Sequence, residues 1–312
     1  MFLVFATNIT IYREKNQEEN ENMNFRTDLA LERCEILGKK AINGVEIESF
    51  DATKARVTRM EVLNSDGEET VGKPIGKYVT VEVTPFAKHS QFIDDSLGAV
   101  VNEIRRIIPE SGSVLVAGLG NKRITPDALG PKCASMIFAT RHITGELLKS
   151  TGLSDLRCVS SVSTGVLGET GAEAGEIIKG VVKMLKPDFV ITVDALAARN
   201  VERLGTTIQM CNTGIVPGSG VGNSRQEISE KTVGVPVISI GVPTVVDAAT
   251  LIMDCVGLDG DEEMIAERTG GLFVTPREVD LMIERASKLT SLAINCALQP
   301  DISPEDMLIL TA

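Results

Sequence analysis

The sequence predicts an α/β fold in which helices cover both faces of a mostly parallel sheet, with an antiparallel hairpin region before it. Two patterns carry this prediction. Between residues 113 and 195, short apolar runs alternate with longer stretches of helical periodicity, as expected for parallel strands that are buried on both faces. Between residues 48 and 83, apolar and polar residues alternate around a Ser-Asp-Gly sequence, which indicates antiparallel strands and favours a hairpin at the edge of a larger sheet.

Local periodicity predicts the individual elements. A first helix is expected at residues 90–108, where apolar residues recur at helical spacing. A long helix is expected at residues 275–298, with Thr275 as its N-cap and Glu278 at the distance of a capping box. Between them we expect helices at 128–143 and 172–186, and strands at 113–118, 156–163, 188–195, 206–212 and 235–243.

Composition argues against several classes of partner. A formal net charge of −12 leaves no basic stripe that could replace the counterions around nucleic-acid phosphates, and it disfavours acidic membranes. Trp is absent and the two tyrosines are Tyr12 and Tyr78, so platforms for stacking single-stranded bases are missing. No run approaches the roughly 20 apolar residues of a membrane span. We therefore expect no direct nucleic-acid partner and no membrane partner.

The six cysteines are spread along the chain and form no CxxC pair. This spacing favours reduced thiols in the core over a disulfide framework or a zinc site. It also fits a cytoplasmic protein.

The N-terminal residues 1–24 end in a polar, acidic stretch, REKNQEENENMN. Such a composition cannot repay the entropy of ordering, so we expect this segment to be flexible. Met23 stands shortly before FRTDLALE, and the sequence leaves open whether translation begins at Met1 or at Met23.

Two aspartates follow strands of the predicted parallel sheet. Asp127 lies in GLGNKRITPDALGP, a short loop after one strand, and Asp194 lies in VITVDALAAR, at the end of another. Open parallel sheets bind ligands beyond the carboxyl ends of their strands, so both side chains can reach one rim. Paired carboxylates shift each other's proton affinity, which lets one act as base toward water and the other as acid toward a leaving group.

Plainer roles compete with this hypothesis. Asp127 precedes a helical pattern and would also serve as a helix N-cap. Asp194 is harder to explain structurally, because a carboxylate in an apolar neighbourhood needs a partner or a function.

Other catalytic groups are scarce. His89 and His142 lie in no Ser, Cys or metal-binding motif, which leaves little material for a catalytic triad or a His-rich zinc site, although carboxylates remain able to hold a hard metal. Three glycine-rich segments, at 118–121, 163–176 and 212–225, are either plain connections or donors of backbone N–H groups to an oxyanion.

From Phe25 to the penultimate helix, the chain resembles the germination protease family, atypical aspartic endopeptidases of spore-forming bacteria. The resemblance is carried by FRTDLALE, VLVAGLGNKRITPDALGPK, STGVLGETGAEAGEIIKGVVKMLKPDFVITVDALAAR, NTGIVPGSGVGN and TPREVDLMIERASKLTSLAINCAL. It implies a fold similar to hydrogenase maturation proteases and places the two catalytic aspartates at Asp127 and Asp194. We expect these to activate water without a metal or cofactor.

The resemblance also implies a zymogen in the forespore and spore core, a homotetramer whose substrates are small acid-soluble spore proteins. Propeptide cleavage in the family falls in the segment matching RTDLA, so Asp28–Leu29 is the expected bond. Residues 1–28 would then be leader and propeptide, and residues 29–312 a single protease domain. An acidic residue, a large apolar residue and Ala stand here in order, similar to the Glu-Phe and Glu-Ile bonds cut in spore proteins. The longer leader before Phe25 leaves the propeptide length open.

Two rival functions stay open at the level of the sequence. One is a metal-dependent endopeptidase of the hydrogenase maturation type, which holds its metal with carboxylates and a histidine. The other is a noncatalytic spore assembly protein that binds its partners through the same acidic crevice.

Overall fold

The computed structural model describes residues 27–37, 42–88, 92–143, 156–222, 225–256, 262–269 and 271–311. The leader expected to be flexible, residues 1–24, lies outside the described residues, and so does His89. The expected cleavage bond, Asp28–Leu29, lies inside them.

A nine-stranded mixed sheet forms the centre of the described part of the molecule, in the order β1-β2-β3-β7-β8-β6-β4-β5, with β9 paired to β8. Strands β5, β4, β6 and β8 are parallel, whereas β1, β2, β3 and β7 are antiparallel and join the parallel half through β8. The predicted α/β fold with its antiparallel edge is therefore confirmed. The strands are β1 (Val45–Ala52), β2 (Ala55–Val62), β3 (Gly76–Val83), β4 (Val114–Leu119), β5 (Val159–Gly165), β6 (Phe189–Ala198), β7 (Thr207–Cys211), β8 (Val237–Asp247) and β9 (Phe273–Val274).

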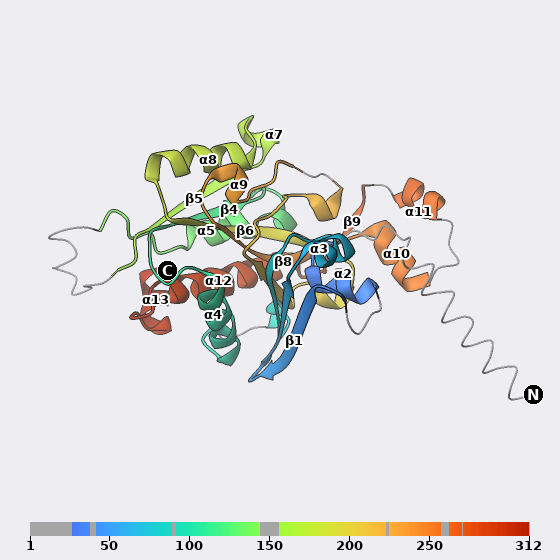
Figure 1. The fold of residues 1–312 in the computed structure, drawn as a ribbon, viewed down its shortest axis with the longest axis horizontal. Helices are drawn as coiled ribbons and strands as arrows, with labels where there is room; N and C mark the ends of the chain where they lie inside the picture. The colour runs from blue at the N-terminus through green and yellow to red at the C-terminus, as the bar shows by residue number, and fades with distance from the viewer. Residues whose placement is uncertain are drawn as a thin grey trace, which may run out of the picture.

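The helices cover both faces of this sheet. Figure 1 shows α8 and α9 on one side and α4, α12 and α13 on the other. The described α-helices are α2 (Ala30–Ile36), α3 (Ser65–Val71), α4 (Asp95–Ile107), α5 (Leu129–Ser135), α7 (Leu167–Thr170), α8 (Ala174–Leu185), α9 (Glu230–Val233), α10 (Ala248–Val256), α11 (Glu262–Thr269), α12 (Val279–Leu298) and α13 (Pro304–Leu310). Short 3-10 turns are η1 (Phe86–Lys88), η2 (Thr125–Asp127), η3 (Val201–Arg203) and η4 (Ser219–Val221).

Alternation along β4 explains the two layers. Val114 and Val116 belong to the large core that includes residues of α4, α5 and α12, whereas Leu115 and Ala117 belong to the core under α8. Successive side chains of a strand point to opposite faces, so a continuous apolar run fills both cores at once. This is why β4 reads as an unbroken hydrophobic segment.

The connection between β2 and β3 differs from the prediction. The Ser-Asp-Gly sequence is the first turn of α3 and not a hairpin turn, because the Asn64 side chain accepts a hydrogen bond from the Gly67 N–H at 3.0 Å and caps the helix. The helix ends at Val71, and the next residue, Gly72, has a left-handed φ of 66°, as is common one residue past a helix. The tight turn of the hairpin lies instead between Ala52 and Ala55.

The predicted helices are shorter in the structure, and for two of them the contacts give the reason. The pattern at 128–143 forms α5 only as far as Ser135, because the following backbone bonds to distant groups: the Phe138 N–H donates to the Asn295 side chain at 3.0 Å and the Thr140 N–H to the Val159 carbonyl at 3.0 Å. The predicted cap at Thr275 is wrong. The hydroxyl of Thr275 donates to the carbonyl of the next residue, and α12 begins at Val279.

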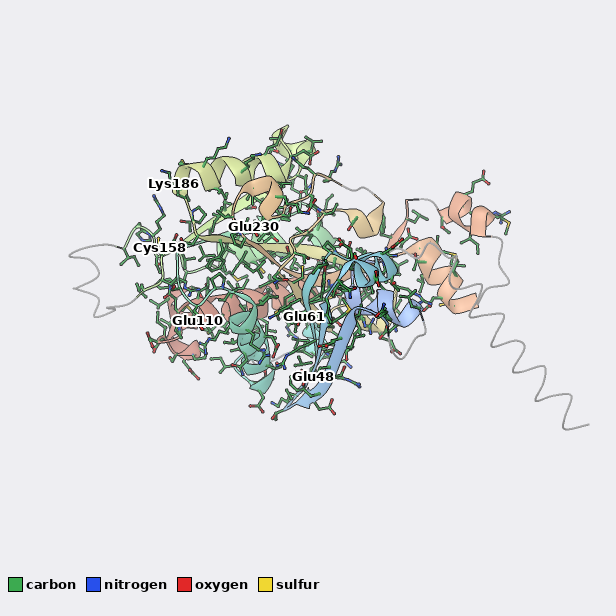
Figure 2. The ribbon with its side chains drawn as sticks, in the orientation of Figure 1. Glu48, Glu61, Glu110, Cys158, Lys186 and Glu230 are labelled. Atoms are coloured by element: carbon green, nitrogen blue, oxygen red, sulfur yellow. The ribbon has the colours of Figure 1, made fainter. Side chains whose placement is uncertain are left out.

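The ends of the parallel strands identify the edge where a site is expected. Glu110, Cys158 and Lys186 precede β4, β5 and β6, and Figure 2 shows all three on the same side of the molecule. The carboxyl ends of these strands therefore lie toward the opposite side, where Figure 1 shows β9 and α10.

All six cysteines are free. Four are buried as predicted, whereas Cys158 and Cys255 are exposed. Among the helices that the structure describes, none combines the length and the apolar composition needed to cross a bilayer.

Candidate active site

Asp194 lies within β6, where β6 extends past its neighbour β4. The β4–β6 pairing stops at Val193, and β6 then continues along β8 as far as Ala198. The sequence placed Asp194 at a strand end. That placement is wrong for β6 itself, because pairing with β8 prolongs the strand. The Asp194 side chain is buried, with 6% of the residue exposed, and its Oδ1 accepts a hydrogen bond from the Ala195 N–H at 2.9 Å.

Asp127 ends the 3-10 turn η2 after β4. Its Oδ2 accepts a hydrogen bond from the Asn121 N–H at 2.7 Å. The alternative role as helix cap is not found, because the N-cap of α5 is Ala128 and no side chain caps that helix. The carboxylate instead closes its own loop and remains beside the end of β4.

Glycines allow the Asp127 loop to approach the sheet. A Cβ on Gly130 would lie 2.2 Å from the Leu119 carbonyl oxygen and 2.4 Å from the Val193 carbonyl oxygen, and such distances are impossible without displacement. A Cβ on Gly120, whose φ is +105°, would lie 2.2 Å from the Asp127 carbonyl oxygen. These contacts hold the start of α5 against the residue that directly precedes Asp194.

Both aspartates line one cavity of about 650 Å³. Segments from the glycine-rich stretches at 118–121, 163–176 and 212–225 contribute to its wall, and so does Asp28. The Asn121 N–H, one candidate oxyanion donor, is already bonded to Asp127. The structure thus brings together the two predicted aspartates and the residue before the expected cleavage bond.

The surroundings of Asp194 and Asp127 in this cavity favour the protonated form of these two carboxyl groups. Burial raises the pKa of Asp194 well above its usual range, and the negative charges of Asp127 and Asp28 raise it further, against the lowering effect of the Ala195 N–H. Burial also raises the pKa of Asp127, against the hydrogen bond from Asn121. Because the charge of Asp127 acts on Asp194, the two groups interact as they titrate.

Asp28 is held at this site by its backbone and its side chain. The Asp28 N–H donates to the Ala197 carbonyl at 2.9 Å, and the Ala197 N–H donates to Asp28 Oδ2 at 2.9 Å. The Ser219 hydroxyl donates to the other carboxylate oxygen at 2.6 Å. A Cβ on Gly220 would lie 2.4 Å from Asp28 Oδ2, so this loop approaches the carboxylate as closely as a glycine permits. The Asp28 segment therefore lies along the part of β6 that follows Asp194.

Leu29 fills an apolar pocket on the other side of the expected bond. It is completely buried and packs with Leu196, Ala198 and Val246. Its N–H donates to the Thr27 hydroxyl at 3.0 Å. The Thr27 hydroxyl in turn donates to the buried carboxylate of Glu32. An acidic residue and a large apolar residue thus occupy two chemically different sites.

Three groups that contact Asp28 were not predicted. Lys73 Nζ and Gln209 Nε2 donate to the Asp28 carbonyl oxygen at 2.9 and 3.2 Å. Ser219 lay in a glycine-rich segment that the sequence had singled out, but no local pattern marked its hydroxyl. Lys73 follows α3 and Gln209 lies on β7, and nothing in their neighbourhoods in the sequence points to a shared ligand.

His142 offers little to this site. His142 is exposed, and it is not among the residues that line the cavity. Within the described ranges, no group of three or more His, Cys, Asp or Glu side chains lies close enough together to hold a metal ion.

Comparison with known proteins identifies the relatives of this chain. A family model described as germination protease matches residues 21–258. The germination protease of Caldanaerobacter subterraneus subsp. tengcongensis is 41% identical over 91% of this chain and 97% of its own length. That of Clostridium tetani is 42% identical over 91% and 98%, and that of Priestia megaterium is 34% identical over 90% and 95%.

Among solved structures, the chain is similar to the [NiFe] hydrogenase maturation protease HycI from Thermococcus kodakarensis, with a TM-score of 0.36, 21% identity, and coverage of 63% of this chain and 98% of that one. The match of the family model and the identities over nearly full length decide the assignment. This chain belongs to the germination protease family.

Proposed function

We propose that this protease is made as a zymogen which cuts its own Asp28–Leu29 bond, and that it then cleaves small acid-soluble spore proteins during germination. Residues 1–28 are leader and propeptide in this proposal, and residues 29–312 are the protease domain. The observation that carries it is the position of Asp28: this residue lines the cavity of Asp127 and Asp194, and its charge reaches Asp194.

In the proposed mechanism the two aspartates share the work on one water molecule. Asp194 is the more buried, and its pKa is raised by burial and by two neighbouring carboxylates, so it carries the proton and acts as the acid. Burial raises the pKa of Asp127 as well, but the Asn121 N–H donates to its carboxylate and favours the charged form, so Asp127 is the one of the two that we assign as the base. Neighbouring carboxylates commonly divide these roles.

The substrate site explains a preference for an acidic residue followed by an apolar one. The Ala197 N–H and the Ser219 hydroxyl bind the carboxylate of Asp28, and the pocket around Leu29 is apolar. Once the new N-terminus at Leu29 has left this pocket, spore proteins with Glu-Phe or Glu-Ile before Ala would place similar groups in the same two positions. The longer Glu side chain would require the Ser219 loop to adjust.

Mutation of the aspartates tests the proposal. The full-length chain, D127N and D194N are purified and incubated, and the products are identified by mass spectrometry. We expect wild-type protein to yield a new N-terminus at Leu29 and a spore protein to be cut after an acidic residue, while both variants stay uncut and folded. D51N, at an exposed position on β1, is the matched control. Cleavage by D127N or D194N at the wild-type rate would remove that residue from the mechanism.

Chelation separates this proposal from a metal-dependent endopeptidase. We expect self-cleavage to survive exhaustive treatment with EDTA and with a nickel-selective chelator, because the proposed chemistry uses carboxylates alone. Loss of activity that returns on adding one metal would favour the rival. Failure of the processed protein to cut any spore protein would favour a noncatalytic assembly role.

A homotetramer is the proposed assembly, on the strength of the family resemblance. Sedimentation equilibrium of the full-length chain measures it directly. A mass four times that of the 33.4 kDa chain is the expected result, and a monomer at micromolar concentration would contradict it.

A further inference from the structure

The carbonyl oxygen of Asp28 receives two side-chain donors. Lys73 Nζ lies 2.9 Å from it and Gln209 Nε2 lies 3.2 Å from it. These residues come from different elements, since Lys73 follows α3 and Gln209 lies on β7. The oxygen belongs to the peptide bond that the proposed self-cleavage breaks, so both donors contact a reacting atom.

Gln209 holds the chain on both sides of Leu29. Its Nε2 donates to the Asp28 carbonyl, and its Oε1 accepts a hydrogen bond from the Ala30 N–H at 2.7 Å. Gln209 is buried, with 8% of the residue exposed. The side-chain amide of Gln209 therefore holds both the Asp28–Leu29 and the Leu29–Ala30 peptide groups. Substrate groups held in this way are presented in a defined orientation.

Two cavities meet at Asp28. One, of about 990 Å³, is lined by Lys73 and Gln209, and the other contains Asp127 and Asp194. Asp28 lines both. The carbonyl oxygen is thus held by donors of the first cavity, while the carboxylates that would activate water belong to the second.

We propose that Lys73 and Gln209 form the oxyanion site of this protease. The inference rests on the proposed function, in which Asp127 and Asp194 cleave the Asp28–Leu29 bond. The same two donors would bind the carbonyl oxygen of the residue before the cleaved bond in a protein substrate, once the propeptide has left.

The chemical step balances with these groups. A water oxygen bonds to the carbonyl carbon of Asp28, one water proton goes to the aspartate that acts as base, and the C=O electron pair moves onto the oxygen. Lys73 and Gln209 stabilise that negative oxygen. The C=O bond then re-forms, the C–N bond to Leu29 breaks, and the leaving nitrogen takes a proton from the aspartate that acts as acid. The products are a new α-carboxyl group on Asp28 and a free α-amine on Leu29.

A positive charge in this position stabilises the transition state more than it stabilises the ground state. The neutral carbonyl gains one hydrogen bond from Lys73, whereas the oxyanion gains an ion pair in a partly desolvated site, where electrostatic interactions are strong. Burial lowers the pKa of Lys73, against the charge of Asp28, which raises it. An anchor for the propeptide would not require a cation, because neutral donors hold backbone carbonyls equally well.

The test compares K73M, K73Q and K73R in the full-length chain. We expect the first-order rate of self-cleavage to fall roughly 100-fold or more in K73M, since loss of one oxyanion donor costs about 10²–10³ in rate. K73R keeps a cation and should recover part of the loss. K77M changes an exposed lysine on β3 and should cleave at the wild-type rate. Circular dichroism and thermal melting verify folding, and K73Q replaces K73M if the latter does not fold.

Hydrogen exchange at the Leu29 and Ala30 amides separates catalysis from anchoring. Slow cleavage with both amides still protected supports the proposal. Cleavage of K73M at the wild-type rate overturns it, and so does slow cleavage with both amides exposed, which would make Lys73 an anchor of the propeptide. D194N separates failure of the proposed function from failure of the oxyanion site. If D194N cleaves itself, the proposed function is wrong. If D194N is inactive while K73M is fully active, only the role of Lys73 is wrong.

Discussion

Asp28 and Asp194 lie within electrostatic reach of each other, although one stands before the expected cleavage bond and the other lies in the middle of the sheet. Burial and the charge of Asp127 raise the pKa of Asp194, and the charge of Asp28 raises it further. The charge of the residue before the expected cleavage bond therefore affects the protonation of the carboxylate that would cleave that bond.

Removing the charge of Asp28 should lower the pKa of Asp194. In D28N the like charge is gone, so the charged form of Asp194 costs less free energy and its titration moves to lower pH. A ¹³C-aspartate NMR titration of D28N against the uncleaved wild-type chain measures this shift. D51N, on exposed β1, should leave the Asp194 titration unchanged, and an unchanged titration in D28N would show that the two carboxylates are not coupled.

Replacing Asp194 should stabilise the fold at neutral pH. The folded-state pKa of Asp194 is raised, so the folded protein binds its proton more tightly than the unfolded chain does. Stability from this group is complete below the unfolded pKa of about 3.9 and is lost as pH rises through the folded pKa. D194N cannot ionise, so its melting temperature should exceed that of wild type at pH 7, and the difference should vanish below about pH 4.

Thermal melts of D194N and wild type across this pH range provide the measurement. D301N, at an exposed aspartate, should follow wild type at every pH. A D194N variant that is less stable than wild type at pH 7 would mean that Asp194 is held as a well-solvated ion.

Adding a methyl group at Gly130 should separate α5 from the sheet. The new Cβ would fall on the Leu119 and Val193 carbonyl oxygens, and overpacking of this kind costs about 1–3 kcal/mol of unfolding free energy. Because the same contact fixes the Asp127 loop, G130A should also slow self-cleavage. Urea unfolding and the cleavage rate measure both effects.

G180A is the matched control for G130A. Gly180 lies on the exposed face of α8 and its Cβ would meet open space. There the substitution should raise stability by about 0.4–1 kcal/mol and leave cleavage unchanged. Equal effects of the two substitutions would refute the role given to the close contact.

Truncating Leu29 should weaken docking of the segment around the Asp28–Leu29 bond. Leu29 is completely buried among Leu196, Ala198 and Val246, and exposing such a side chain forfeits about 1.5–3 kcal/mol. Self-cleavage of L29A should therefore slow by roughly 10- to 100-fold, because each 1.4 kcal/mol corresponds to about tenfold. L37A removes a partly buried side chain just after α2 and should lower stability without changing the cleavage rate.

The sequence by itself determined the layers of the fold. Alternation in β1 to β3, unbroken apolar runs in β4 and β6, and amphipathic α4 and α8 are properties of neighbouring residues, so periodicity predicts them. It also drew attention to Asp127, Asp194 and the Asp28–Leu29 bond, through strand ends and family motifs. It misjudged the ends of two helices. α5 stops at Ser135 because the following backbone bonds to distant residues, and α12 begins at Val279 because the Thr275 hydroxyl bonds to the Pro276 carbonyl and does not cap the helix.

Only the tertiary structure decided which groups meet at the Asp28–Leu29 bond. Asp28 reaches β6 through Ala197 and meets Lys73, Gln209 and Ser219, and these contacts join residues far apart in the chain. Local patterns contain no information about such contacts, because they are fixed by strand order and by loops packing across the sheet. Neighbouring residues therefore determine the helices and strands, and the packing of distant segments against one another determines the geometry of the site.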